Sequence, residues 1–253
     1  MSVIGIFHQL KNWAANRPNI IGQMKAPLLV IVLALCAGLF GQEGPSTTPV
    51  ELPKKPHHKL LLENAEVRVF RVELQPGEAT LPHRHEHLYT YLSLHPVTLA
   101  NEVRGRPPVV VELEGGEVHT SKGGFTLAER NKSPEVAALI VIESVKGEAG
   151  GFATPIGGFR YHDAAFAELF QFPVMRGYSM VVAAGGSTEK HEEQYDRLVL
   201  AVSDLKLRED AAGQPSSEIL MNAGDIKWFP RGMSHATTNT GNSPATFITF
   251  EFE

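Results

Sequence analysis

Short apolar segments separated by turn residues dominate the pattern of hydrophobic and polar positions along this chain. The segments are rich in Val, Ile, Leu, Phe and Thr, and Gly and Pro residues lie between them, which is typical of an all-β protein. One stretch is ambiguous, because Asp163 is a suitable N-cap and the alanine-containing segment 163–170 fits a short helix as well as a strand. The pattern predicts strands over 67–74, 109–113, 137–144, 198–202 and 246–252.

The second half of the chain repeats the first half at a constant offset of 108 residues. So many turn residues at one spacing indicate a gapless internal duplication, in which each half forms one structural unit. Each half also has the length of a single β-barrel domain. The residues that match at this offset are Gly77 and Gly185, His83 and His191, Gly116 and Gly224, Gly124 and Gly232, and Asn131 and Asn239.

Two motifs lie within the repeat. The segment from Gly224 to Asn239 contains the pattern Gly-x5-Pro-x-Gly-x2-His-x3-Asn, whose histidine is His235. Glycine and proline at these intervals mark tight turns between short strands. Upstream, a Gly-x5-His-x-His pattern contains His83 and His85, and a looser copy of it contains His191. These patterns are the two motifs of the cupin family, so residues 57–253 resemble a two-domain cupin, or bicupin. The resemblance implies two tandem jelly-roll barrels, also called double-stranded β-helices.

The resemblance also implies a metal site inside a barrel, since cupins hold a divalent metal there with imidazole and carboxylate ligands. In the second half it indicates His191, Glu193 and His235, a set of two histidines and one carboxylate that suits non-haem iron(II). Manganese, nickel, copper and zinc are the other metals that such ligands suit. Arg197 stands where cupins carry a glutamate, and two roles stay open for it: an ion pair that neutralises Glu193 without a metal, or a bidentate contact to an anionic substrate.

The first half keeps His83 and His85 as candidate metal ligands. Leu127 takes the position of His235, and Tyr89 takes the position of the glutamate, which makes Tyr89 a candidate substrate-binding residue. Glu129 shares the face of Leu127 and is a candidate acidic ligand, because strand side chains alternate between faces. His87 extends the alternating series, but we expect it at the rim of the barrel. The remaining histidines are expected mainly at the surface: His57, His58, His95, His119 and His162.

The N-terminal segment 1–42 is predicted to be a signal peptide. Its apolar core, residues 27–40, follows Lys25 and is too short for a comfortable membrane span, so we expect export and a periplasmic or secreted mature protein without a membrane segment. The remaining predicted divisions are a Pro-rich linker over 43–57, a first barrel over 58–146, a Gly-rich linker over 147–158 and a second barrel over 159–253.

Charge and composition narrow the classes of partner. The formal net charge is −5 and the chain has no basic stretch, so nucleic acid is not an expected partner.

Three functions stay open, because cupin barrels host many activities. The first is a metal-dependent enzyme, such as an oxygenase or isomerase, acting on a small organic molecule. The second is a binding module, a bicupin that holds a small ligand such as a sugar or an aromatic acid without turnover. The third is a structural duplication that forms homodimers. Each half has fewer than the usual four ligands, so the sequence does not decide whether the protein is an enzyme.

Overall fold

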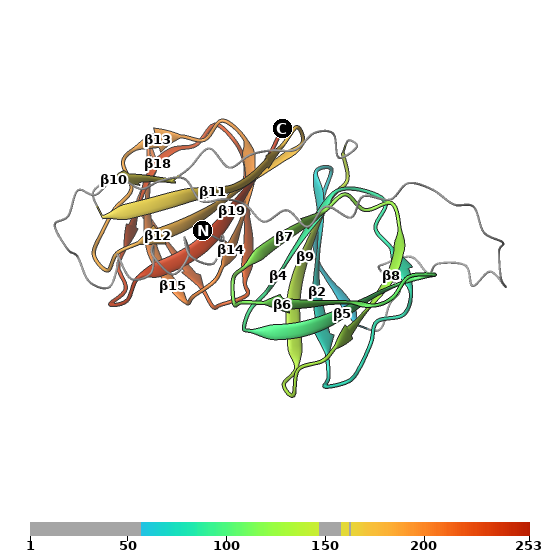
Figure 1. Cartoon of the computed structure of the whole chain (residues 1–253). Coiled ribbons are helices and arrows are strands. Elements are labelled where there is room, and N and C mark those ends of the chain that lie inside the picture. The colour runs from blue at the N-terminus through green and yellow to red at the C-terminus, as the bar shows by residue number, and fades with distance from the viewer. Residues whose placement is uncertain (1–56, 147–157, 162) are drawn as a thin grey trace.

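The computed structural model describes residues 57–146, 158–161 and 163–253, and these residues form two β-barrels that pack side by side (Figure 1). Within these ranges the chain contains 19 strands in four sheets and no helix. The predicted all-β fold of two tandem jelly-roll barrels is confirmed. Among the described residues, no helix has the length and apolarity that crossing a membrane requires.

Nine strands form the first barrel. They are β1 (His58–Glu63), β2 (Val67–Leu74), β3 (His83–Arg84), β4 (Tyr89–Ser93), β5 (Val97–Val103), β6 (Val109–Leu113), β7 (Val118–Ser121), β8 (Thr126–Asn131) and β9 (Ala137–Ser144). A five-stranded sheet in the order β1-β2-β9-β4-β7 lies against a four-stranded sheet in the order β3-β8-β5-β6. The strands pair with their neighbours in antiparallel orientation.

Ten strands form the second barrel. They are β10 (Gly158–Tyr161), β11 (Ala164–Phe172), β12 (Met175–Val182), β13 (His191–Glu192), β14 (Asp196–Ala201), β15 (Leu205–Ala211), β16 (Ser217–Met221), β17 (Ile226–Phe229), β18 (Ser234–Asn239) and β19 (Ala245–Phe252). Its sheets run β10-β11-β12-β19-β14-β17 and β13-β18-β15-β16. Apart from the added edge strand β10, the strand order is that of the first barrel, so the sequence repeat is a repeat of topology.

The predicted strands agree closely with the observed ones. Strands β2, β6 and β9 have the predicted bounds, whereas β14 and β19 begin one or two residues earlier than expected. The ambiguous segment 163–170 is strand β11 rather than a helix. A strand is favoured there because β11 pairs with β10 on one side and β12 on the other, which gives its backbone hydrogen-bond partners on both edges.

Three apolar cores stabilise the molecule. One fills the first barrel, one fills the second, and a third lies between the barrels. Strand β9 contributes to two of them, since Leu139 and Val141 belong to the core of the first barrel while Ile140 and Ile142 belong to the core between the barrels. All eight residues of β9 are therefore buried. Burial of both faces explains why such strands read as continuous apolar runs.

The glycines of the motifs lie at turns that require them. Gly77 and Gly185 have φ values of 78° and 71°, a region that favours glycine. The backbone N–H of Gly77 donates to the carbonyl of Asn131, and that of Gly185 donates to the carbonyl of Asn239, at 3.0 Å in both cases. The turn that precedes each motif histidine is thus fixed in the same way in the two barrels.

Several predicted segments lie outside the described residues. These are the signal segment 1–42, nearly all of the linker 43–57, and the Gly-rich linker 147–158 apart from Gly158. Their boundaries stay predictions.

Candidate functional site

The second barrel brings three predicted metal ligands together in its interior. His191 and His235 lie directly opposite each other in the ladder between β13 and β18, and Glu193 follows two residues after His191. One carboxylate oxygen, Glu193 Oε1, lies 3.1 Å from His191 Nε2 and 3.0 Å from His235 Nε2. The three side chains each offer a donor atom within 4.8 Å of the others. Glu193 and His235 are buried, whereas His191 is exposed at the mouth of the barrel.

Arg197 lies in the same cluster. Its Nη1 is 2.8 Å from Glu193 Oε1, and its Nη2 is 3.0 Å from His235 Nε2. A guanidinium can only donate hydrogen bonds, so Nε2 of His235 accepts from Arg197 and the proton of this imidazole lies on Nδ1. From there it is donated to Glu209 Oε1, 3.0 Å away. Two roles were left open for Arg197, an ion pair with Glu193 and a bidentate contact to an anionic substrate. The structure contains the ion pair with Glu193.

His191 makes two hydrogen bonds to groups that only accept. Its Nε2 contacts Glu193, and its Nδ1 lies 2.8 Å from the backbone carbonyl of Glu189. Both bonds form together only when the imidazole carries both protons. The hydrogen bond with Glu193 accordingly raises the pKa of His191, against the opposing effect of burial.

The electrostatics of the cluster favour ionised groups. Burial alone would raise the pKa of Glu193, but the hydrogen bond from His191 and the charge of Arg197 help to lower it to about 2. Burial lowers the pKa of Arg197 from its usual value, and the carboxylates of Glu193 and Glu209 oppose that effect. The cluster therefore keeps a carboxylate and a guanidinium in direct contact inside the barrel.

A divalent metal does not fit this second-barrel cluster as it stands. The metal would need donor atoms from Glu193 and His235, and Arg197 already contacts Oε1 of Glu193 and Nε2 of His235. It would also need an unprotonated nitrogen from His191, which the two hydrogen bonds of that side chain oppose. The three ligands predicted for this barrel are thus close together, but a permanent cation lies among them. Their role as metal ligands stays a prediction.

A cavity of about 430 Å³ lies inside the second barrel, and residues of this cluster line it. The polar residues that line it include Arg197, His191 and Glu209. Glu251 also lines it, and burial raises the pKa of that carboxyl group. The remaining walls are mainly apolar, and they include Phe166, Met180, Leu207, Ile219, Met221 and Phe247. Such a cavity suits a small molecule with an apolar body.

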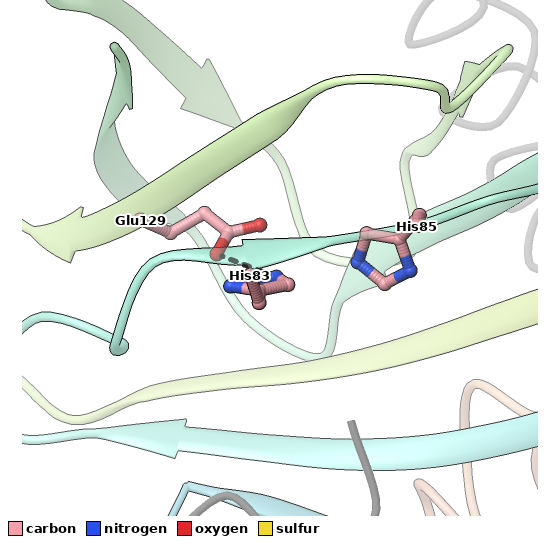
Figure 2. A group of neighbouring side chains, drawn as sticks. All are labelled: His83, His85 and Glu129. Atoms are coloured by element: carbon pink, nitrogen blue, oxygen red, sulfur yellow. Dashed lines mark ion pairs between the residues drawn. The ribbon is translucent and has the colours of Figure 1, made fainter. Parts of the chain in front are cut away.

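The first barrel contains a different cluster at the equivalent place (Figure 2). It consists of His83, His85 and Glu129, whose donor atoms all lie within 4.8 Å of one another. Figure 2 shows Glu129 facing His83, with His85 further along the same stretch of chain. The distance from His83 Nε2 to Glu129 Oε2 is 3.4 Å. Thr80 donates a hydrogen bond of 3.1 Å to the same carboxylate oxygen and so orients it.

The residues of the first barrel fit a divalent metal. His83 Nδ1 lies 3.0 Å from the carbonyl of Leu81 and donates to it, which directs Nε2 of the same ring towards the carboxylate of Glu129, 3.4 Å away. Imidazole nitrogens and a carboxylate that converge inside a barrel are the donor set that a divalent transition metal takes. Tyr89 occupies the position that Arg197 holds in the second barrel. Burial, and then the charge of Glu129, raise the pKa of Tyr89, so this side chain stays neutral.

Tyr89, predicted to bind substrate, lies beside this cluster. Its ring stacks on His85 with a centroid separation of 4.0 Å. His85 Nδ1 in turn lies 3.6 Å from Glu143, which Arg68 contacts at 3.4 Å. Burial would raise the pKa of Glu143, but the interaction with His85 and the charge of Arg68 lower it. The pair of Arg68 and Glu143 recurs at the 108-residue offset as Arg176 and Glu251, 3.5 Å apart.

His58 was missed by the sequence reasoning, and its expected place at the surface is wrong. It is buried, and its ring centroid lies 4.9 Å from that of His83. His58 pairs with Val72 across β1 and β2, and Val72 faces the core of the first barrel, so His58 points inward as well. Glu209 was also missed, although it continues the buried alternation of Leu205 and Leu207 along β15 and that parity could have revealed it.

The other histidines outside the motifs take no part in either cluster. His57 lies 3.6 Å from Glu78, and His119 stacks on Tyr91 and contacts Glu117. His95 and His87 are half-buried, and His162 lies outside the described residues. His87, which was expected at the rim of the barrel, is thus half-buried rather than exposed.

Comparison with known proteins identifies the fold. No protein-family model matches the chain, and no curated protein matches its sequence. Solved structures do match: AerE from Microcystis aeruginosa, at 12% identity and a TM-score of 0.56, over 79% of this chain and 98% of that one. An oxalate decarboxylase from Bacillus subtilis matches at 11% identity with a TM-score of 0.56, and the match covers 83% of this chain and 78% of the decarboxylase. Vicilin from Capsicum annuum matches at 12% identity with a TM-score of 0.56, and the match covers 74% of this chain and 76% of the vicilin. The chain thus has the cupin fold in its two-barrel form.

Proposed function

We propose that this protein is an exported bicupin that binds a divalent transition metal in its first barrel and a small organic molecule in its second. The observation that carries the metal site is the convergence of His83, His85 and Glu129 in a buried interior. The similar oxalate decarboxylase from Bacillus subtilis contains Mn(II) centres, which supports a metal in a barrel of this fold. Export rests on the apolar segment 27–40 after Lys25. Binding, rather than a particular reaction, is the function that this geometry supports.

His83, His85 and Glu129 would hold the ion. When bound, a divalent metal supplies Lewis acidity and open coordination positions for a small molecule. The protein's own contribution is to orient the donors: Leu81 fixes the tautomer of His83, and Thr80 fixes the carboxylate of Glu129. Such supporting contacts commonly change metal affinity by 10- to 100-fold.

Elemental analysis of the purified protein tests the metal site. Protein produced with manganese or iron should contain one equivalent of metal that His83→Ala removes. His95→Ala is the matched control, because His95 is a half-buried histidine of the same barrel outside the cluster. Equal metal content in the His83 variant and the unaltered protein would contradict the proposal.

The second barrel's cavity would hold the organic molecule. Its apolar walls fit a hydrocarbon or aromatic body, and the cluster in its lining offers hydrogen-bonding groups. A volume of about 430 Å³ lies within the usual range for small-molecule sites. This property favours a ligand-binding role whether or not the protein catalyses a reaction.

Adjacent residues on strand β16 provide a test of this site. Ile219 lines the cavity, whereas the next residue, Leu220, is exposed. Ile219→Trp should therefore fill the cavity and weaken binding of the uncharged fluorescent probe N-phenyl-1-naphthylamine at least tenfold. Leu220→Trp should leave the affinity unchanged. Melting temperatures would show that both variants fold, and equal affinities in the two variants would exclude the cavity as the binding site.

A further inference from the structure

We propose that the guanidinium of Arg197 takes the place of a metal ion in the second barrel, so that this barrel assembles its polar centre and functions without a metal. The inference goes beyond the proposed function, since it concerns the cluster of the second barrel and does not require a metal in the first.

Arg197 makes the contacts that a cation would make. It bridges the carboxylate of Glu193 and the unprotonated nitrogen of His235, at 2.8 and 3.0 Å. These two acceptor atoms lie only 3.0 Å apart, a separation that is unfavourable for two facing lone pairs unless positive charge lies beside them. The guanidinium supplies that charge from a side chain of the barrel itself.

Arg197 is also held in place by its surroundings. Only 8% of the residue is exposed, and its guanidinium carbon lies 4.9 Å from the centroid of the Phe229 ring. Strand β14 positions it, because Arg197 pairs with Phe229 on one side and with Glu251 on the other. A cation stacked on an aromatic ring and surrounded by sheet is not displaced without breaking several contacts.

The cluster already contains a permanent cation. The guanidinium of Arg197 lies 2.8 Å from Glu193 Oε1, so this carboxylate has a positively charged partner without a metal. A divalent ion added to this set would carry two positive charges next to Arg197. At a few ångströms, even an effective dielectric constant of about 20 makes that repulsion several kcal/mol.

The first barrel shows the contrasting arrangement. There the equivalent of Arg197 is Tyr89, a neutral side chain that stacks on His85. Its cluster has a carboxylate oxygen of Glu129 that lies 3.4 Å from Nε2 of His83. The same fold therefore presents one cluster that fits an external cation and one that contains its own.

A metal titration of the isolated second cluster tests the inference. The starting protein would be the double variant His83→Ala/His85→Ala, so that the first barrel cannot bind Co²⁺. A failure of the metal site proposed for the first barrel then does not affect the result for the second. Co²⁺ binding would be measured by calorimetry and by visible absorption. We expect no binding at this cluster while Arg197 is present. Arg197→Met should create one Co²⁺ site and raise the affinity for Co²⁺ at least tenfold. The substitution removes the competing positive charge and leaves the carboxylate of Glu193 without its ion-pair partner. Adding His235→Ala should abolish the new site.

Two results would overturn the inference. One is a starting protein that binds one equivalent of Co²⁺ and loses it on His235→Ala while Arg197 is intact. The other is a folded Arg197→Met variant, verified by circular dichroism and thermal melting, that gains no affinity. If Arg197→Met does not fold, the comparison of the starting protein with its His235→Ala derivative decides alone: Co²⁺ binding that depends on His235 overturns the inference, and its absence supports it.

Discussion

Leu127 occupies in the first barrel the position that His235 occupies in the second. Leu127 lies directly opposite His83 in the ladder between β3 and β8, and His235 lies directly opposite His191 between β13 and β18. Both side chains are buried and face the interior. The duplicated framework has therefore kept its geometry while its chemistry has diverged.

Leu127→His should raise the metal affinity of the first barrel at least tenfold, because it adds a third imidazole beside His83 and His85. Thr126→His is the control, since successive residues of a strand point to opposite faces. Calorimetric titration with Mn²⁺ or Co²⁺ of both variants would measure the difference. Equal affinities would show that the interior geometry does not admit this donor.

Glu129→Gln should weaken metal binding in the first barrel at least tenfold. The amide keeps the size of the side chain and its contact with Thr80, but it removes the negative charge that faces His83. Glu114→Gln, at an exposed position of the same barrel, controls for a general change in charge. A Glu129 variant that retained full affinity in the same titration would exclude the carboxylate as a ligand.

Gly123→Ala should disturb the cluster of the first barrel far more than Gly124→Ala. Both glycines have positive φ, so both substitutions cost about 1 kcal/mol or more in backbone strain. A methyl group on Gly123 would also come within 2.7 Å of the backbone oxygen of His85, whereas one on Gly124 would meet nothing within 4 Å. Urea unfolding and metal titration would measure the free energy of unfolding and the metal affinity of both variants. Losses of similar size in the two variants would contradict this account.

Asn239→Ala should destabilise the protein by about 2 to 3 kcal/mol. The buried amide of Asn239 donates to the carbonyls of Val182 and Ser243 at 3.0 and 2.8 Å and accepts from the N–H of Gly241 at 2.9 Å. These groups would lose their partners. The exposed Asn222→Ala should cost less than about 1 kcal/mol. Chemical denaturation of the two variants checks the expectation, which a loss of similar size would contradict.

The depressed pKa of Glu193 predicts a loss of stability in acid. The pKa is about 2 in the folded chain and 4.5 ordinarily, so the ionised form stabilises the folded state above about pH 4.5. That contribution, on the order of 2 kcal/mol, should fall progressively as the pH drops from 4.5 towards 2. Denaturant unfolding at pH 5 and pH 3 would measure it. Glu193→Gln should show a flatter dependence than the exposed Glu218→Gln, and parallel curves would contradict the prediction.

Much of the fold could be predicted from the sequence, because apolar runs, turn residues and strand alternation act over only a few residues. Strands such as β2 and β9 were predicted with their correct bounds from apolar runs between turn residues, and the turn glycines of the duplication fixed which positions are equivalent. His83, His85, His191 and His235 followed from the same landmarks. Alternation along a strand depends only on the chain itself, and it placed Glu129 on the face of Leu127.

What the sequence by itself determined is therefore the all-β class, the duplication and the positions of the motif histidines, since period-two patterns and turn chemistry act within a few residues. Only the tertiary structure decided that His58 lies beside His83, since this required the pairing of β1 with β2. It also decided that Arg197 bridges Glu193 and His235, which lie 42 residues apart. Contacts between distant segments depend on strand register and on the packing of a closed barrel, and no local pattern in the chain specifies either.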